Sequence, residues 1–120
     1  MAKLRADPLI HLELHTGKKA LACATYARLC GWRSERIDAG GGSYTALTLG
    51  GRVGGGIVEC ATERAVWLPY VQVSELDAAT RRAQELGATL LVEPREGPVG
   101  WRSVVALPAC GELAFWQPKR

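Results

Sequence analysis

Side chains able to exchange protons gather near the N-terminus of this 120-residue chain. Apolar and polar residues alternate over Pro8–His15, which predicts a strand with His11, Glu13 and His15 on one face. Imidazole and carboxylate groups suit acid–base chemistry near neutral pH. His11 and His15 are separated by about 13 Å of strand, so they cannot bind one metal ion together, and Glu13, about 6–7 Å from His11, is also poorly spaced.

Other common chemical motifs are absent from the sequence. Cys23, Cys30, Cys60 and Cys110 form no C-x-x-C pair, so we expect reduced cysteines that act as small apolar residues, with a reactive Cys60 or Cys110 as the alternative. The sequence has no phosphate-binding loop, no dinucleotide-binding glycine motif and no nucleophile elbow.

The composition is that of an ordinary globular protein, with 48% hydrophobic and 22% charged residues. The net charge of +3 is spread along the chain, which argues against a nucleic-acid partner. No apolar run approaches the roughly 20 residues that span a bilayer, and the N-terminus lacks the apolar core of a signal peptide. We therefore expect one cytoplasmic domain over residues 1–120, without a membrane partner.

The predicted elements follow one order twice, strand–helix–strand–strand–strand. Thr16 is the expected N-cap of the first helix, Ser74 begins a sequence resembling a capping box before the second, and Gly31 and Gly87 end them, 56 residues apart. Turns are expected at Gly40–Gly42, Gly50–Gly51 and in the loop Pro94–Pro98, and Gly54–Gly56 indicate a bulge or a close backbone approach. The helices are expected at Lys18–Leu29 and Asp77–Leu86, and the strands at Pro8–His15, Trp32–Ile37, Ser43–Leu49, Arg52–Cys60, Val66–Val73, Ala88–Glu93, Gly100–Leu107 and Glu112–Gln117.

This repeat predicts an α+β fold made of two tandem βαβββ modules, about residues 8–60 and 66–118. Each module supplies a four-stranded sheet with a helix on one face. Two such sheets joined at their edges form a curved mixed sheet around a cleft.

Four segments, His11–Leu14, Thr25–Trp32, Tyr70–Val73 and Phe115–Lys119, resemble the vicinal oxygen chelate superfamily, in particular its small glyoxalase-like and bleomycin-resistance-like bacterial members. The resemblance runs from about Leu9 to Lys119 and departs at Gly17, where similar proteins often carry an acidic residue. It implies the cleft and a homodimer. The superfamily includes lyases, epimerases, dioxygenases, thiol transferases and antibiotic-binding proteins, so the fold does not choose among them.

The resemblance also implies four metal-binding positions, on the first and last strands of each module. They fall on His11, Glu59, Leu68 (or Pro69 if the register slips) and Phe115. Only His11 and Glu59 can bind a metal, and two ligands are too few for a tightly held catalytic ion. We therefore expect no cofactor, with a weakly bound divalent metal as the alternative.

His11 and Glu59, if they are neighbours across the sheet, would form a catalytic His–carboxylate dyad able to act as a general base. The alternative for Glu59 is a partly buried carboxylate paired with that histidine or with an arginine. If the cleft is lined by these positions, strand alternation adds Tyr70 and Gln72 beside Leu68, and Leu113 and Gln117 beside Phe115. Trp101 would lie at the rim, and Trp67 and Trp116 would point toward the helices. The predicted ligand-binding residues are Glu13, Leu68, Tyr70, Gln72, Trp101, Leu113 and Phe115.

Two functions from different classes follow. The first is metal-independent binding of a small organic molecule, such as an antibiotic or a metabolite, in an apolar and aromatic cleft. The alternative is a glyoxalase-like lyase or isomerase that uses His11 and Glu59, with or without a weakly bound divalent metal.

Overall fold

The computed structural model describes residues 6–39, 42–97 and 99–119. The predicted order of elements is confirmed, so the fold is α+β and consists of two βαβββ modules. No helix in the described part of the chain is long and apolar enough to cross a membrane. The elements are β1 Leu9–Thr16, α1 Lys19–Cys30, β2 Arg33–Ala39, β3 Gly42–Thr48, β4 Gly54–Glu59, β5 Val66–Gln72, α2 Leu76–Glu85, β6 Thr89–Glu96, β7 Gly100–Leu107 and β8 Gly111–Pro118.

The chain divides into two compact units that follow the repeat closely. One unit, called here the first unit, comprises His11–Leu68. The other, the second unit, comprises the described residues of Met1–Ile10 and Pro69–Arg120. β1 therefore lies mostly in the first unit and β5 mostly in the second.

In the first unit the strands follow the order β2-β3-β4-β1, with β1 parallel to β4 and the remaining neighbours antiparallel. The side chains of Leu14, Leu47 and Ile57 are buried on one face of this sheet. Because Lys19 of α1 donates a hydrogen bond from Nζ to Oγ1 of Thr45 at 3.2 Å, that face is the one nearest α1. The opposite face carries the polar residues of β1.

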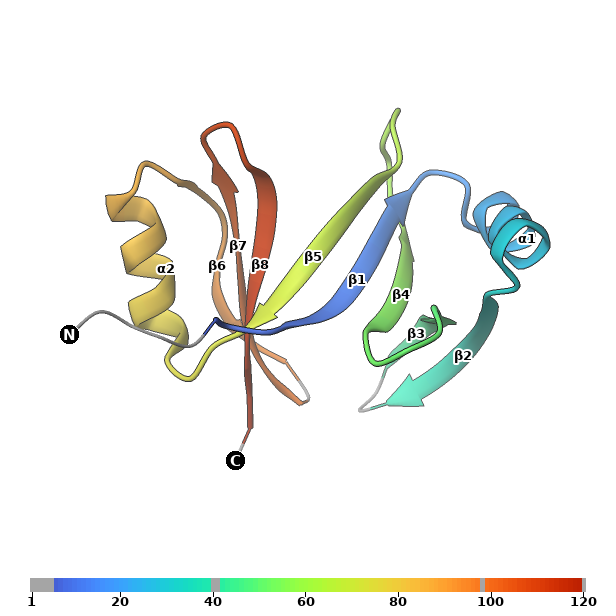
Figure 1. The fold of residues 1–120 in the computed structure, drawn as a ribbon, viewed down its shortest axis with the longest axis horizontal. Coiled ribbons are helices and arrows are strands. Elements are labelled where there is room, and N and C mark those ends of the chain that lie inside the picture. The colour runs from blue at the N-terminus through green and yellow to red at the C-terminus, as the bar shows by residue number, and fades with distance from the viewer. Residues whose placement is uncertain (1–5, 40–41, 98, 120) are drawn as a thin grey trace. The chain divides into compact units, whose positions relative to one another are not determined.

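The second unit repeats this plan with the order β5-β8-β7-β6, and β5 is parallel to β8. Helix α2 lies along β6, β7 and β8 (Figure 1). Its inward side is well defined, since Leu76, Thr80 and Ala83 are buried. The hydroxyl groups of Thr80 and Ser103 are 2.8 Å apart, which places Ser103 of β7 on the α2 face of the sheet.

Helix α1 differs from α2 in that none of its residues is buried. Its sequence is apolar on most sides, yet Leu21 is 60% exposed and Leu29 is 75% exposed. A helix of this composition is normally covered by other protein.

Both helices begin against a side chain from the last strand of their own module. Glu59 of β4 accepts a hydrogen bond from the backbone N–H of Lys19 at 3.0 Å, and Gln117 of β8 accepts one from Leu76 at 2.7 Å. These contacts satisfy the first free N–H of each helix. The predicted caps are thus wrong: Thr16 accepts instead from the N–H of Lys18, and the residue before α2 is Glu75, without a side-chain cap bond.

The helix ends and one turn agree with the sequence. Gly31 has a φ of 73° and caps α1 in the left-handed region, where glycine is favoured. The Gly50–Gly51 turn is confirmed by φ values of 83° and 78°. The predicted loop Pro94–Pro98 is wrong at its start, because β6 continues to Glu96. Gly40 and Gly41 of one predicted turn, and Pro98, lie outside the described residues.

Candidate functional site

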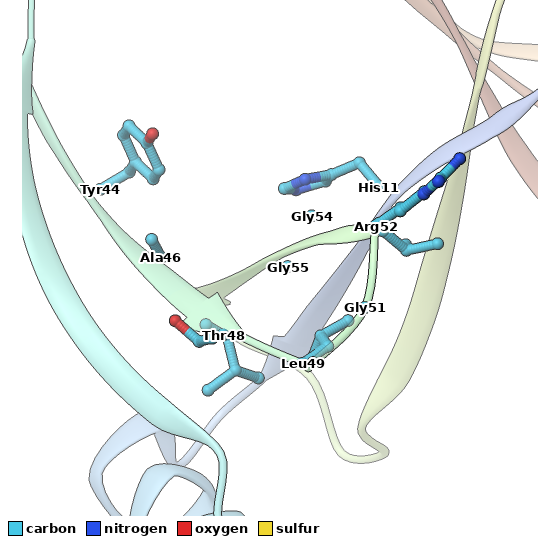
Figure 2. A pocket seen from close by; sticks show the side chains of 12 residues that line it. His11, Tyr44, Ala46, Thr48, Leu49, Gly51, Arg52, Gly54 and Gly55 are labelled. Atoms are coloured by element: carbon cyan, nitrogen blue, oxygen red, sulfur yellow. The ribbon is translucent and has the colours of Figure 1, made fainter.

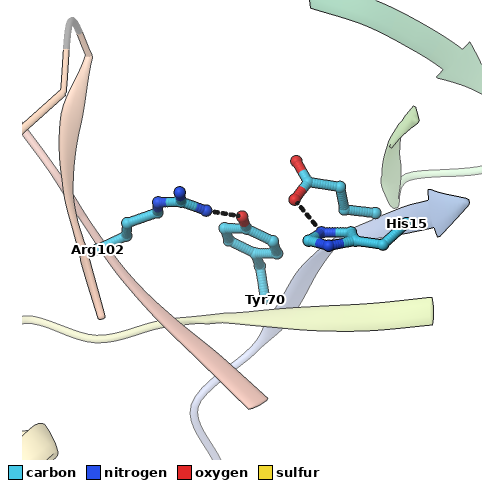
Figure 3. Close-up of polar contacts among 4 residues, drawn as sticks. His15, Tyr70 and Arg102 are labelled. Atoms are coloured by element: carbon cyan, nitrogen blue, oxygen red, sulfur yellow. Dashed lines mark hydrogen bonds and ion pairs between the residues drawn. The ribbon is translucent and has the colours of Figure 1, made fainter. Parts of the chain in front are cut away.

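Three polar side chains lie in a row on the face of the first unit's sheet that points away from α1. Strand alternation places His11, Glu13 and His15 there, as predicted. The carboxylate Oε1 of Glu13 is 2.7 Å from Nε2 of His15, a contact drawn in Figure 3. A neutral imidazole bonded in this way carries its proton on Nε2 and leaves Nδ1 as a proton acceptor. The structure therefore contains a His–carboxylate pair within a single strand.

His11 lies at the end of this row, beside the glycines of β4. Its register partner is Gly54, and a Cβ atom on Gly56 would lie 3.1 Å from Nε2 of His11. The close backbone approach predicted for Gly54–Gly56 is thus confirmed, since the imidazole occupies the space that a side chain on Gly56 would need. Burial lowers the pKa of His11 below its ordinary value of 6.5, and the charge of Glu13 partly opposes this by raising it. At neutral pH the His11 ring is therefore uncharged.

His11 lines an open concavity of about 390 Å³ in the first unit (Figure 2). The floor is the glycine-rich start of β4, and the walls come from β3 and from the turn that joins β3 to β4. Tyr44, Thr48 and Arg52 supply the polar groups, and Ala46, Leu47, Leu49 and Val53 supply apolar surface. In the view of Figure 2 the imidazole of His11 points toward Tyr44, with Arg52 on its other side.

The predicted His11–Glu59 dyad is contradicted by the register of the sheet. Glu59 pairs with Thr16, five residues along β1 from His11, which corresponds to about 17 Å of strand. Its side chain lies on the α1 face, where its Oε2 atom accepts the hydrogen bond from Lys19. Glu59 therefore starts a helix and cannot act with His11.

In the second unit a tyrosine and an arginine meet on the face of the sheet away from α2. Nη1 of Arg102 donates a hydrogen bond of 2.8 Å to the phenolic oxygen of Tyr70, which is 6% exposed (Figure 3). Tyr70 pairs with Ala114, and both lie on this face. Leu68 and Gln72 share the face with Tyr70 by alternation, as predicted, and their binding roles stay predictions.

The predicted orientation of β8 is wrong by one residue. Phe115 pairs with Ser103, and Leu113 pairs with Val105, so both point to the α2 face. Gln117 points the same way, because it caps α2. The residue of β8 that lies beside Tyr70 is Ala114. Phe115 and Leu113 therefore lie on the α2 face and not beside Tyr70, which contradicts their predicted orientation.

Two of the three tryptophans whose orientation was predicted lie on a different face of the sheet from the one expected. Trp67 does lie toward α1, where its ring centroid is 5.7 Å from that of Tyr26. Trp116 instead covers Gly100 on the face away from α2, since a Cβ there would lie 2.7 Å from its ring. Trp101 pairs with Gln117 on the α2 face, with Nζ of Lys119 5.7 Å from its ring centroid, and so does not occupy the predicted rim position.

The donor set does not fit the metal that the fold family implies. Within residues 6–39, 42–97 and 99–119 there is no group of three or more His, Cys, Asp or Glu side chains placed to hold an ion. The Glu59 carboxylate accepts a hydrogen bond at the start of α1, and the side chains of Leu68 and Phe115 have no atoms that can bind a metal. The residues at the four implied positions therefore do not form a complete metal site, and metal independence stays a prediction.

Comparison with solved structures decides the fold. Methylmalonyl-CoA epimerase from Mycobacterium tuberculosis superposes with a TM-score of 0.68 at 16% identity, over 100% of this chain and 94% of that one. The chain has the vicinal oxygen chelate fold. A Bacillus halodurans C-125 hypothetical protein gives a TM-score of 0.70 at 12% identity, covering 97% of both chains. A variant of Streptomyces coelicolor methylmalonyl-CoA epimerase, in complex with 2-nitronate-propionyl-CoA, gives 0.65 at 12% identity, covering 95% and 99%.

No family model and no curated protein matches the sequence. The structural matches establish the vicinal oxygen chelate fold, as the sequence resemblance predicted, and the site has to supply the argument for chemistry.

Sequence reasoning missed several residues of the site. Tyr44, Thr48 and Arg52 belong to no recognisable motif, although Gly50–Gly51 indicate a turn that brings the flanking residues together. The contact of Glu13 with His15 was signalled by their spacing of two in a strand. Nothing in the sequence pointed to the contact of Arg102 with Tyr70.

Proposed function

We propose that the protein is an isomerase or lyase that moves a proton at a carbon next to a carbonyl group, with His11 as the acid–base residue. The observation that carries this proposal is the position of His11, whose half-buried imidazole lines the concavity beside the β4 glycines. A titratable group with a perturbed pKa in a concave site is a strong candidate for catalysis.

The reaction needs only the imidazole. Burial keeps the pKa of His11 low, so the ring is in its proton-accepting form and removes a proton from the substrate carbon, leaving an enolate and an imidazolium. The imidazolium then returns the proton to the carbon, or to a neighbouring atom, and the neutral ring is restored. Glu13 is a positioning residue in this scheme: its charge favours the imidazolium formed in the first step.

The structural matches support isomerase chemistry as the first to test, since several are named methylmalonyl-CoA epimerases. Exchange of the substrate proton with solvent is the direct readout. The purified protein is incubated in D₂O with methylmalonyl-CoA, and separately with the thiol adduct of an α-ketoaldehyde, and deuterium incorporation is followed by NMR.

We expect His11→Gln to lower the exchange rate by about 100-fold or more, the usual contribution of an acid–base group. Exchange that is unchanged in His11→Gln would overturn the role of His11. Arg36→Gln serves as the control, because Arg36 lies on β2 and pairs with Asp38 at 3.5 Å.

A second function, binding of a small organic molecule without turnover, is favoured by the apolar part of the concavity, which Ala46, Leu49 and Val53 provide. A compound that raises the melting temperature without deuterium exchange would support this function over the first.

For either function we propose metal independence. Elemental analysis of the purified protein is expected to give far less than one ion per chain, and a chelator is expected to leave the melting temperature and the exchange rate unchanged. A stoichiometric ion whose removal abolishes activity would contradict this prediction.

A further inference from the structure

The concavity beside His11 has the electrostatic character of an anion site. Of the residues that line it, Arg52 is the one with a permanent charge, and no aspartate or glutamate is among them. His11 is uncharged at neutral pH, because burial lowers its pKa. The hydroxyl groups of Tyr44 and Thr48 add hydrogen-bond donors. A guanidinium and two hydroxyl groups lining one concavity, without a carboxylate, favour a negatively charged ligand.

The turn between β3 and β4 positions Arg52, and its side chain does not help to hold the fold together. The left-handed Gly50 and Gly51 reverse the chain, and the exposed side chain of Arg52 follows directly. In the described part of the chain no acidic side chain forms an ion pair with it. Two other cations are held by partners: Arg102 donates a hydrogen bond to Tyr70, and Lys119 pairs with Glu96 at 2.8 Å.

We propose that the substrate is an anion whose carboxylate or phosphate binds Arg52 while its reacting carbon lies at His11. This inference rests on the proposed function for the role of His11, but the binding step is independent of turnover. Arginine binds carboxylates and phosphates through two parallel N–H donors, which lysine cannot reproduce. An anion held beside His11 also favours the imidazolium form and so strengthens the base when substrate is present.

The test measures binding and needs no knowledge of the natural substrate. The chain has two histidines, so its NMR spectrum contains two sets of imidazole signals, and the His11→Gln variant identifies the set of His11. The wild-type protein is titrated with malonate, with inorganic phosphate, and with malonamide, the uncharged diamide of malonate. The same titrations are run on Arg52→Gln and on Arg36→Gln, which removes an equal charge from β2.

We expect malonate or phosphate to shift the His11 signals saturably and malonamide to leave them unchanged. Arg52→Gln is expected to weaken binding at least about tenfold, since even one lost charge-assisted hydrogen bond has that effect, and Arg36→Gln is expected to leave affinity unchanged. The stronger of the two anions identifies the group that the site recognises.

Equal binding of malonate and malonamide, unchanged affinity in Arg52→Gln, or a shift of His15 alone would each overturn the proposal. Thermal melts of the variants show whether they fold. Anion binding at Arg52 without deuterium exchange would reject the proposed catalysis and leave the anion site standing, so the two failures are distinguishable.

Discussion

The proposed chemistry depends on the uncharged imidazole of His11. Burial disfavours its charged form, so its pKa is lower in the folded chain than the value of 6.5 expected when unfolded. Between these two pH values the unfolded chain binds more protons than the folded chain. The free energy of unfolding must therefore fall as the pH drops through 6.5 toward the folded pKa.

This sign gives a prediction for stability. Urea unfolding at pH 7.5 and pH 5 is expected to show a smaller loss of stability in His11→Gln than in the wild type, because the variant lacks the titrating ring. If the wild type and His11→Gln lost the same free energy of unfolding between pH 7.5 and pH 5, the pKa of His11 would not be lowered by burial.

The same sign predicts the pH dependence of activity. The proton-accepting form of His11 persists below pH 6.5, so the exchange rate should fall only at a lower pH. In Glu13→Gln we expect the pKa of His11 to fall further, since the Glu13 charge now raises it. An NMR titration of the two histidines measures both effects, and a rise of the His11 pKa in Glu13→Gln would be the opposite outcome.

At the scale of elements, the start of α1 shows that the Glu59 carboxylate has a structural role. Glu59 contacts the first N–H of α1, so Glu59→Ala is expected to lower the free energy of unfolding by about 1 kcal/mol and to leave proton exchange intact. Glu59→Gln keeps an acceptor oxygen and should recover most of that stability. Loss of exchange in a folded Glu59→Gln variant would restore a chemical role for this residue.

The glycines of β4 give a second prediction at this scale. A Cβ on Gly55 would lie 2.7 Å from Cγ of Leu49, whereas on Gly56 it would meet His11. We expect Gly55→Ala to cost about 1–3 kcal/mol by overpacking. Gly56→Ala should mainly displace the His11 ring and lower activity. Chemical unfolding together with the exchange assay separates the two, and an unaffected Gly55→Ala protein would contradict the packing.

For the molecule as a whole, the sequence predicted the fold better than the site. The periodicity and the two helix-ending glycines, Gly31 and Gly87, were enough for the order of elements. The site needed the register between strands that are distant in sequence. Nothing local shows that Gly54, and not Glu59, lies opposite His11. On β8 the neighbours Phe115 and Trp116 are both aromatic, and the polar Glu112 and Gln117 lie on opposite faces, so alternation does not fix the inward face.

The exposed apolar side chains of α1 bear on assembly. We retain the predicted homodimer and expect light scattering to give about twice the chain mass of 12.9 kDa. Leu29→Glu on α1 should weaken the dimer if this helix is covered by the second copy, while Leu86→Glu, at an equally exposed position after α2, is the matched control. A wild-type mass near 13 kDa would refute the homodimer.

The matching caps of the two helices have a consequence for how such a protein changes over time. Glu59 and Gln117 perform the same task at the two helix starts, while the open faces of two strands differ: β1 carries His11, Glu13 and His15, and β5 carries Leu68, Tyr70 and Gln72. The residues that start the helices are thus different from the residues on the open faces of β1 and β5. Substitutions on the open face of β5 can therefore change what that face binds while both helix starts, and the residues of the proposed His11 site, stay the same.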